Sequence, residues 1–241
     1  MGSRYGPLWE VYWKDLPQRD SEAFWDCPPD LGAATHIRLF GPYADPTLPL
    51  IDVGCGNGTQ TAYLAGHYER VLGVDIAEAA LAKARQVNGG PRVEYRRLDI
   101  LDEAAVREFR DELGEVNVYL SGVIHQLTPA DRDTCIRSLA LLTGGRGTVF
   151  AQELTPDSYH YMAHLITTGR HDLPKLDRVS AYFGIGLQTA AGEAELEAVF
   201  TAARFELLAA GSLSMHTTEK LTDGTPLTLP AHYVVARPQR P

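Results

Sequence analysis

From Leu48 onward, short apolar runs alternate with amphipathic segments, and this alternation constrains the fold more than any other feature of the sequence. In one of the amphipathic segments, Ala80, Leu81 and Ala84 recur at helical spacing. The strand-like runs fall at 48–53, 70–75, 92–100, 116–123 and 148–154. Five strands joined through helices by short connections require right-handed crossovers, so the pattern predicts an α/β doubly wound fold with helices on both faces of a parallel sheet.

The alternation stops after Glu153 and resumes with a helix that contains Leu196 and Phe200. The intervening segment, 155–188, is rich in aromatic residues, histidines and helix breakers, and we interpret it as an insertion at the edge of the sheet. Two further strand-like runs close the chain and are joined through Asp223 and Gly224, which favour a tight reversal. Residues 1–45 precede the first strand and contain a predicted helix near 33–41 together with all three tryptophans.

Composition favours one globular domain over residues 1–241. The chain has 241 residues, of which 44% are hydrophobic and 22% charged. A formal net charge of −9 repels phosphate backbones, so we expect no nucleic-acid partner. We also expect no membrane span and a cytoplasmic location, because no apolar run is long enough and the N-terminus lacks a signal-peptide core. The three cysteines lie far apart and suit neither a disulfide framework nor a metal cluster.

The first strand ends in IDVGCGNG, which places the carboxylate of Asp52 two residues before a glycine-rich turn. Gly54, Gly56 and Gly58 permit tight turning and let a ligand approach bare backbone. Asp75 ends the second strand about 20 residues after Gly54, where an acid accepts hydrogen bonds from ribose hydroxyls.

This arrangement suits a nucleoside cofactor. The spacing is not that of the dinucleotide motif, and Asp52 would repel a pyrophosphate but suit a ligand with cationic groups. The alternative for Asp52 is that it caps the turn through backbone N–H groups.

The segments IDVGCGNGT and VLGVDIAEAALAKAR resemble the first two motifs of the class I S-adenosylmethionine-dependent methyltransferases. The resemblance runs from about Leu48 to the C-terminus apart from the insertion, and it implies a seven-stranded sheet whose last strand is antiparallel. It also implies S-adenosylmethionine as the cofactor and a small molecule as the methyl acceptor. By this resemblance Gly54, Cys55 and Gly56 contact the cofactor, Asp52 lies near its methionine end, and Asp75 and Ile76 bind the ribose and adenine.

Two later segments extend the resemblance. RRLDI resembles the third motif, in which Asp99 meets the adenine amino group and Ile100 packs on the ring, although both could be ordinary turn and core residues. YLSGVIHQL resembles the fourth, in which Ser121 and Gly122 line the methionine portion. His125 either faces the transferred methyl group as a catalytic residue or only orders the loop. No Asn-Pro-Pro-Tyr sequence follows, which disfavours the amino groups of adenine or glutamine as acceptors.

The two additions to the alternating pattern are predicted to form a lid and the acceptor pocket, because specificity in open α/β folds resides in such additions. The residues with suitable side chains are Tyr5, Trp9, Tyr12, Trp13, Tyr159, His160, Tyr161, His164 and Phe183. Ordinary packing is the alternative for the aromatic ones. His160 and His164 share a helical face, but no Glu follows His160 and no third ligand is evident, so we predict no metal.

The predicted reaction is in-line transfer of a methyl group from S-adenosylmethionine to an oxygen, nitrogen or carbon atom of a small molecule. Placement of the acceptor supplies roughly 7–11 kcal/mol in such reactions, more than a single general base. Two alternatives stay open. The chain could hold the cofactor without catalysis, or, against the motif spacing, it could be an NAD-type enzyme.

Overall fold

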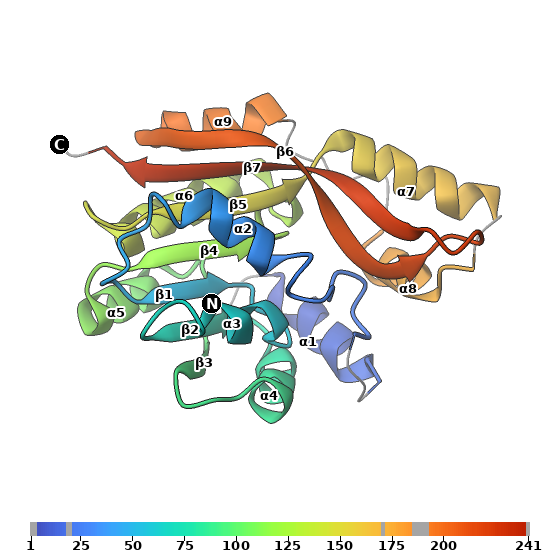
Figure 1. The fold of residues 1–241 in the computed structure, drawn as a ribbon, viewed down its shortest axis with the longest axis horizontal. Helices are drawn as coiled ribbons and strands as arrows, with labels where there is room; N and C mark the ends of the chain where they lie inside the picture. Colours follow the sequence, from blue (N-terminus) through green and yellow to red (C-terminus); the bar gives the residue numbers. More distant parts are fainter. Residues whose placement is uncertain (1–3, 18–20, 170–171, 185–192, 240–241) are drawn as a thin grey trace.

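The computed structural model describes residues 4–17, 21–169, 172–184 and 193–239 (Figure 1). A sheet of seven strands forms its middle layer. The strands are β1 (Leu50–Val53), β2 (Val71–Asp75), β3 (Val93–Arg97), β4 (Asn117–Ser121), β5 (Val149–Leu154), β6 (Phe205–Lys220) and β7 (Pro226–Pro238). Their order across the sheet is β3, β2, β1, β4, β5, β7, β6, and β7 runs antiparallel to both β5 and β6. The predicted doubly wound sheet with an antiparallel last strand is confirmed.

Helices cover both faces of this sheet (Figure 1). One face carries α2 (Ala33–Phe40), α3 (Thr59–Leu64) and α4 (Glu78–Val87), and the other carries α5 (Glu103–Leu113), α6 (Pro129–Thr143) and α9 (Glu193–Ala202). Successive residues of a strand point to opposite faces, so Leu50 packs with Phe40 of α2 while Ile51 joins the core beneath α6. Because both faces are covered, the strands are apolar throughout, and a polar residue within them needs a specific explanation.

The end of the β6–β7 hairpin that contains the turn extends beyond the parallel strands (Figure 1). There it packs against α7 (Pro156–Thr168) and α8 (Pro174–Phe183), the two helices of the segment predicted to be an insertion. Phe24, from the segment before β1, and Leu154, at the end of β5, belong to the same apolar cluster. The hairpin, the insertion and the N-terminal segment therefore together enclose a space beyond the carboxyl end of β5.

The start of α6 is tied to the N-terminal segment that carries α1 (Gly6–Asp15). Thr128 caps α6, with its hydroxyl oxygen accepting a hydrogen bond from the Asp131 N–H. The Thr128 N–H, which a capping box would bond to the Asp131 side chain, instead donates to the Tyr5 hydroxyl at 3.1 Å. Tyr5 in turn donates to Asp131 at 2.7 Å. The loop before α6 and the beginning of α1 are thus held together.

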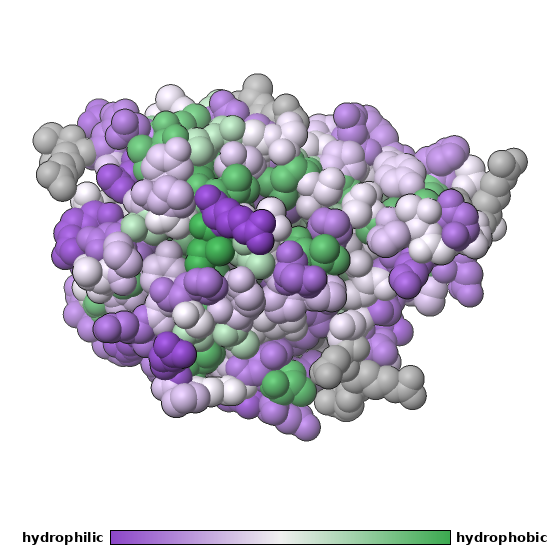
Figure 2. Space-filling view, in the orientation of Figure 1, coloured by the Kyte–Doolittle hydropathy of each residue, from purple (hydrophilic) through white to green (hydrophobic). Residues whose placement is uncertain are grey.

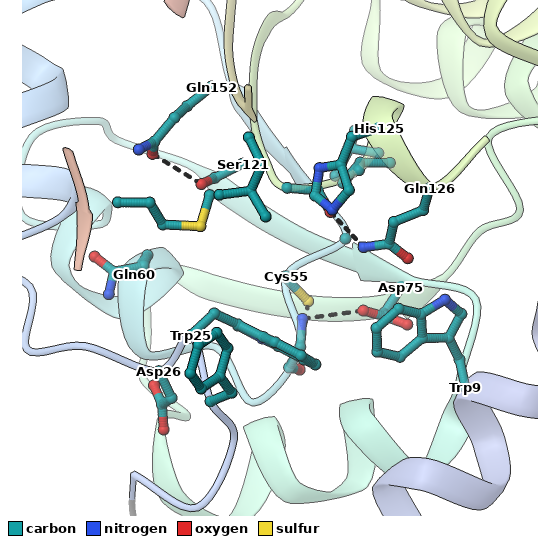
Figure 3. Close-up of a pocket in the computed structure, with 18 of the residues that line it drawn as sticks. Trp9, Trp25, Asp26, Cys55, Gln60, Asp75, Ser121, His125, Gln126 and Gln152 are labelled. Atoms are coloured by element: carbon teal, nitrogen blue, oxygen red, sulfur yellow. Dashed lines mark hydrogen bonds between the residues drawn. The ribbon is translucent and has the colours of Figure 1, made fainter. Parts of the chain in front are cut away.

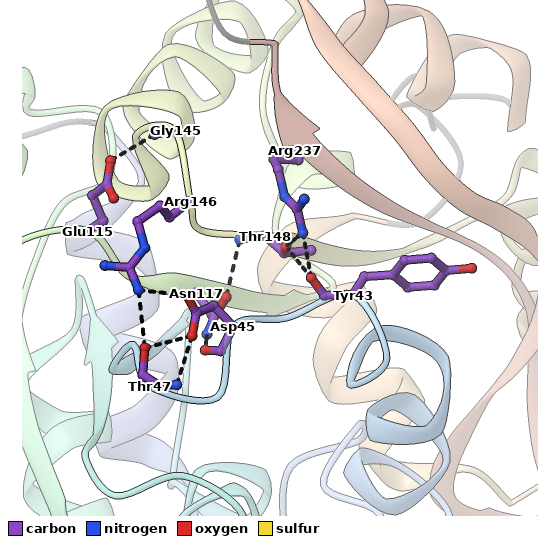
Figure 4. Close-up of polar contacts among 9 residues, drawn as sticks. All are labelled: Tyr43, Asp45, Thr47, Glu115, Asn117, Gly145, Arg146, Thr148 and Arg237. Atoms are coloured by element: carbon purple, nitrogen blue, oxygen red, sulfur yellow. Dashed lines mark hydrogen bonds and ion pairs between the residues drawn. The ribbon is translucent and has the colours of Figure 1, made fainter.

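At the amino ends of the parallel strands, polar contacts fix the loop that leads into β1 (Figure 4). The Asn117 side chain is fully buried, donates to the Asp45 carbonyl at 2.7 Å and accepts from the Thr148 N–H at 3.2 Å. Arg146 forms an ion pair with Asp45 at 2.7 Å. This network joins the amino ends of β1, β4 and β5, far from the carboxyl ends where the candidate site lies.

We expect Asn117→Ala to lower the free energy of unfolding by about 1–3 kcal/mol, because it leaves the buried Thr148 N–H without its acceptor and removes one of two donors to the Asp45 carbonyl. Urea denaturation measures the change. Thr47→Ala removes an exposed side chain from the same network and should cost less than about 1 kcal/mol. A loss below about 0.5 kcal/mol for Asn117→Ala would contradict this account of the network.

Hydrophilic residues dominate the face shown in Figure 2, and apolar residues interrupt them in several places. The clearest apolar exposures away from the cavity are single side chains, such as Val11 of α1 and Val87 at the end of α4. Within the described ranges, every helix is too short or too polar to cross a membrane.

Candidate active site

The turn after β1 needs glycine for two separate reasons. Gly54, Gly56 and Gly58 have φ angles of +73°, +55° and +81°, in the left-handed region that L-residues with side chains rarely adopt. A Cβ atom on Gly56 would also lie 2.8 Å from the ring of Trp13, and one on Gly54 would lie 2.6 Å from Val123. The turn is therefore a bare backbone surface on which α1 is packed directly.

Two buried carboxylates flank this turn. Asp75, 8% exposed, accepts hydrogen bonds from the N–H groups of Gly56 at 3.0 Å and Ala77 at 2.9 Å. Asp52, 3% exposed, accepts from the Thr61 hydroxyl at 2.6 Å, so its described bond goes to a side chain of α3 and not to the backbone of the turn. Burial raises the pKa of Asp52 to about 7 and that of Asp75 to about 6. Both sites favour a ligand that donates hydrogen bonds or carries positive charge.

A cavity of about 460 Å³ opens beside these carboxylates. All the residues predicted to bind the cofactor line it: Asp52, Gly54, Cys55, Gly56, Asp75, Ile76, Asp99, Ile100, Ser121 and Gly122. Asp99 also accepts from the Leu101 N–H at 3.0 Å, as a turn residue would. Burial raises the pKa of the Cys55 thiol well above its usual value, so this cysteine stays neutral.

The cavity continues from this cofactor side into a space that we call the apolar lobe, lined by Phe24, Leu154, Met162, Val179 and Met215. These five residues come from the N-terminal segment, β5, α7, α8 and β6. Polar side chains lie between the two parts. Ser121 donates to Gln152 at 3.0 Å, and Figure 3 shows this pair on the opposite side of the cavity from Trp9 and Asp75. The apolar lobe has the composition of a small-molecule site.

The predicted lid residues divide into two groups. Tyr5, Trp9, Trp13, Tyr159 and Phe183 line the cavity. Trp9 and Phe183 join α1 to α8, with ring centroids 4.2 Å apart, and Trp25 lies 5.5 Å from Trp9. An aromatic cluster from three separate segments therefore covers the cofactor side.

Four residues of the predicted lid and pocket, Tyr12, His160, Tyr161 and His164, do not line the cavity. Tyr12 is 1% exposed and is enclosed by the other rings of the aromatic cluster. On α7, Met162 and Leu165 face the body, and the helical rotation of about 100° per residue then turns His160 and His164 to the solvent. Tyr161 packs at the edge of the apolar cluster without reaching the cavity. Among the described residues, no group of three or more His, Cys, Asp or Glu side chains could hold a metal ion.

His125 lies on the cavity wall in a short 3-10 turn, η1 (Ile124–Gln126). Its Nδ1 lies 2.6 Å from Oε2 of Glu153, a carboxylate at the end of β5 that is 1% exposed. Glu153 also accepts backbone hydrogen bonds from Val123, Ile124 and His125 at 2.9–3.1 Å. The geometry is compatible with both interpretations of His125. Its ring lies on the cavity wall, as a catalytic residue would, and its carboxylate partner Glu153 also orders the loop.

Sequence reasoning missed several residues in the cavity wall, and Glu153 directly behind it. Glu153 and Gln152 interrupt an otherwise apolar buried strand, and that interruption was a usable signal. His36 and Tyr119, which lie 2.8 Å apart and line the cavity, belong to a helix and a strand that look like ordinary core. The Asn57 side chain donates a hydrogen bond to Asp26 at 2.6 Å, and the Gln60 side chain donates one to the Cys27 carbonyl at 2.8 Å. These bonds hold the segment before α2 against the glycine turn and the start of α3. No local pattern predicts such contacts.

Comparisons with known proteins agree with this geometry. The family described as "Methyltransferase domain" matches residues 50–147. The ubiquinone biosynthesis O-methyltransferase of Stutzerimonas stutzeri (strain A1501) is 31% identical over 156 residues, which cover 60% of this chain and 62% of that protein. The chain thus spans somewhat less than two thirds of this curated relative.

Solved structures extend the likeness to nearly the whole chain. A SAM-dependent methyltransferase from Anabaena variabilis ATCC 29413 superposes with a TM-score of 0.90 at 28% identity, covering 98% of this chain and 96% of that one. The N-methyltransferase NodS from Bradyrhizobium japonicum WM9, in complex with S-adenosyl-L-homocysteine, shares the fold with a TM-score of 0.63 at 15% identity over 97% of this chain and 99% of that one. The matching domain family, the sequence relatives and the shared fold, together with the glycine turn and its two carboxylates, make this chain similar to the class I S-adenosylmethionine-dependent methyltransferases.

Proposed function

We infer that the protein transfers a methyl group from S-adenosylmethionine to a small molecule seated in the apolar lobe. The observation that carries this proposal is the continuity of one cavity, which runs from the glycine turn and its carboxylates past Ser121 and His125 into the apolar lobe. A donor at one end and an acceptor at the other would meet near His125. Such juxtaposition is the main requirement of a transfer from an activated sulfonium.

The chemistry of the wall supports this cofactor. The carboxylate oxygens of Asp75 can accept hydrogen bonds from the two ribose hydroxyls. Ile76 and Ile100 offer apolar contacts for the adenine. Asp52 suits the ammonium group of the methionine portion. Gly54 and Gly56 line the cavity and keep the turn tight, with left-handed φ angles that other residues rarely adopt. S-adenosylmethionine supplies the activated methyl group when bound, and the residues of this chain hold it and exclude water.

The cover over the cavity supports a small acceptor. The Trp9, Trp25 and Phe183 rings lie above the cofactor side, and α7 and α8 close the apolar lobe. We propose that α1, α7 and α8 act as a lid that shields the reacting groups from solvent. Residues 170–171 and 185–188 of the predicted insertion lie outside the described residues. The relative from Stutzerimonas stutzeri carries the name of an O-methyltransferase, which supports an oxygen acceptor for this chain as well.

The direct test is incubation with S-adenosylmethionine carrying an isotopically labelled methyl group and a panel of small phenols, amines and active-methylene compounds. Transfer of label to a small molecule, with release of S-adenosylhomocysteine, supports the proposal. Tight binding of S-adenosylhomocysteine without transfer to any member of a broad panel would instead favour a module that holds the cofactor without catalysis.

The raised pKa of Asp52 predicts how cofactor affinity depends on pH. An ammonium group binds the ionised carboxylate, and with a pKa of about 7 that form is the minor one at pH 6 and the major one at pH 8. Affinity for S-adenosylhomocysteine should therefore rise by about tenfold between pH 6 and pH 8, with proton release on binding at the lower pH. Calorimetry in buffers of different ionisation enthalpy measures both quantities. Asp52→Asn should flatten the profile, and an unchanged profile in that variant would contradict the role of Asp52.

A further inference from the structure

The carboxylate of Glu153 is buried behind the cavity wall at His125, and its contacts converge on one loop. Its two oxygens accept three successive backbone N–H groups, from Val123, Ile124 and His125. A buried carboxylate needs such partners, because an unpaired one is strongly destabilising. The loop before α6 is therefore folded around Glu153, and the 3-10 turn η1 begins at the residues whose N–H groups bond this carboxylate.

The same carboxylate determines which nitrogen of His125 carries hydrogen. Oε2 already accepts the His125 backbone N–H at 3.0 Å, so it acts as an acceptor toward Nδ1 at 2.6 Å as well, and Nδ1 is the protonated nitrogen. Nε2 then keeps its lone pair. No described residue bonds Nε2, and the ring lies on the cavity wall with its Cε1 edge toward Gly122.

Charged and aromatic groups pack around the pair. Arg132 of α6 donates to the Ile124 carbonyl at 3.2 Å and to Glu195 of α9 at 2.6 Å. His232, the β7 neighbour of Glu153, lies 2.9 Å from Glu197. The Tyr159 ring contacts the His125 ring edge-on, with centroids 6.1 Å apart. These contacts hold the loop and both partners in place, so the His125 ring has a fixed orientation.

We propose that Glu153 is a positioning residue that makes His125 the general base of the reaction, and that the acceptor atom is the oxygen of a hydroxyl group. A neutral amine attacks a methyl sulfonium without prior loss of a proton, whereas a phenol or alcohol gains most from a base. In the balanced step the acceptor oxygen forms a bond to the methyl carbon, and the sulfur–methyl bond breaks with its electron pair going to sulfur. The hydroxyl proton goes to Nε2 of His125, and the resulting imidazolium is stabilised by Glu153.

This inference rests on the proposed function for the reaction itself, but its first test needs no turnover. In protein labelled with ¹⁵N-histidine, at a pH of about 8.5 where a free imidazole is neutral, long-range proton–nitrogen NMR spectra report the tautomer of each ring. His125→Gln assigns the signal by deleting it. We expect the Nδ1–H tautomer in the wild type, with and without S-adenosylhomocysteine. A wild-type Nε2–H tautomer would overturn the proposal.

The variant that removes the positioning contact is Glu153→Gln. A glutamine whose oxygen takes the backbone N–H groups presents its amide hydrogens to Nδ1, so we expect the Nε2–H tautomer there. The matched control is Glu195→Gln, the same substitution on a partly exposed carboxylate that contacts Arg132 and not His125, and it should keep the wild-type tautomer. An unchanged His125 signal in folded Glu153→Gln would also overturn the proposal, and the wild-type spectrum decides the matter if that variant does not fold.

Turnover gives the second readout. With a hydroxyl acceptor, Glu153→Gln should lower kcat by about 10²–10³-fold with KM within about threefold. Adding His125→Gln should cause little further loss, because the two residues act as one unit. Acceptors that are already ionised at the assay pH should recover most of the rate. Equal losses for ionised and neutral acceptors would contradict the base, whereas failure to bind S-adenosylhomocysteine would contradict the proposed function and leave the tautomer result standing.

Discussion

Asp75→Ala is expected to lower the affinity for S-adenosylhomocysteine by roughly 10²–10⁴-fold. The substitution removes a carboxylate that faces the cavity and would accept hydrogen bonds from two ribose hydroxyls, each worth roughly 1.5–3 kcal/mol to a charged acceptor. It also frees the Gly56 and Ala77 N–H groups, which now hold the glycine turn against the end of β2. Isothermal titration calorimetry measures the change, with circular dichroism to verify the fold.

Asp102→Ala is the matched control. Asp102 is also an aspartate just beyond a strand, but it is exposed, caps α5 through the Ala104 and Ala105 N–H groups and does not line the cavity. Its replacement should lower stability by about 1 kcal/mol and leave the affinity unchanged. Equal affinity losses in the two variants, or an Asp75→Ala protein that binds normally, would show that Asp75 only supports the turn.

Trp13→Ala is expected to lower the free energy of unfolding by about 3–5 kcal/mol, the largest stability effect that we predict. Trp13 is 4% exposed and its ring lies directly on Gly56, so its removal opens a cavity between α1 and the glycine turn. Urea denaturation measures the loss. Val11→Ala, on the outer side of the same helix where Val11 is 49% exposed, should stay within about 0.5 kcal/mol of the wild type.

A substitution at Trp9 distinguishes a packing role of α1 from a role in cofactor binding. Trp9 is only partly buried and lies beside Asp75 on the cavity wall (Figure 3), so Trp9→Ala should cost about 1–2 kcal/mol of stability. Its cofactor affinity should nevertheless fall by about tenfold, because the cover over the cofactor side is lost. Normal cofactor affinity and normal turnover in Trp9→Ala would mean that α1 is packing alone and not a lid.

The sequence predicts this fold well because the signals for it are local. The alternation of buried strands and amphipathic helices, the glycine turn and the Thr128 cap each arise within a few residues. The ends of the hairpin were less predictable. β6 runs to Lys220, well past the apolar residues that predict it, because its second half packs on α7 and α8 and not on the sheet. Val87 continues an apolar stripe but is 45% exposed, since α4 ends there.

The cofactor side could also be predicted, because the residues concerned sit at strand ends that any parallel sheet brings to one edge. The acceptor side could not. Its wall comes from five separate elements, and which face of α7 meets the cavity depends on how that helix docks. Aromatic and histidine content predicts a pocket there but does not separate Tyr159, which lines it, from His160 and His164, which face solvent.

The central claim is that the glycine turn and its two carboxylates bind the cofactor of a methyltransferase, and competitive calorimetry with S-adenosylhomocysteine and NAD tests it most directly. Asp75 suits the ribose of either ligand, whereas Asp52 favours an ammonium group and disfavours a pyrophosphate beside the turn. The account predicts one site per chain with a dissociation constant in the micromolar range for S-adenosylhomocysteine and at least about 100-fold weaker binding of NAD. Tighter binding of NAD, or no heat of binding with S-adenosylhomocysteine in folded protein, would contradict it.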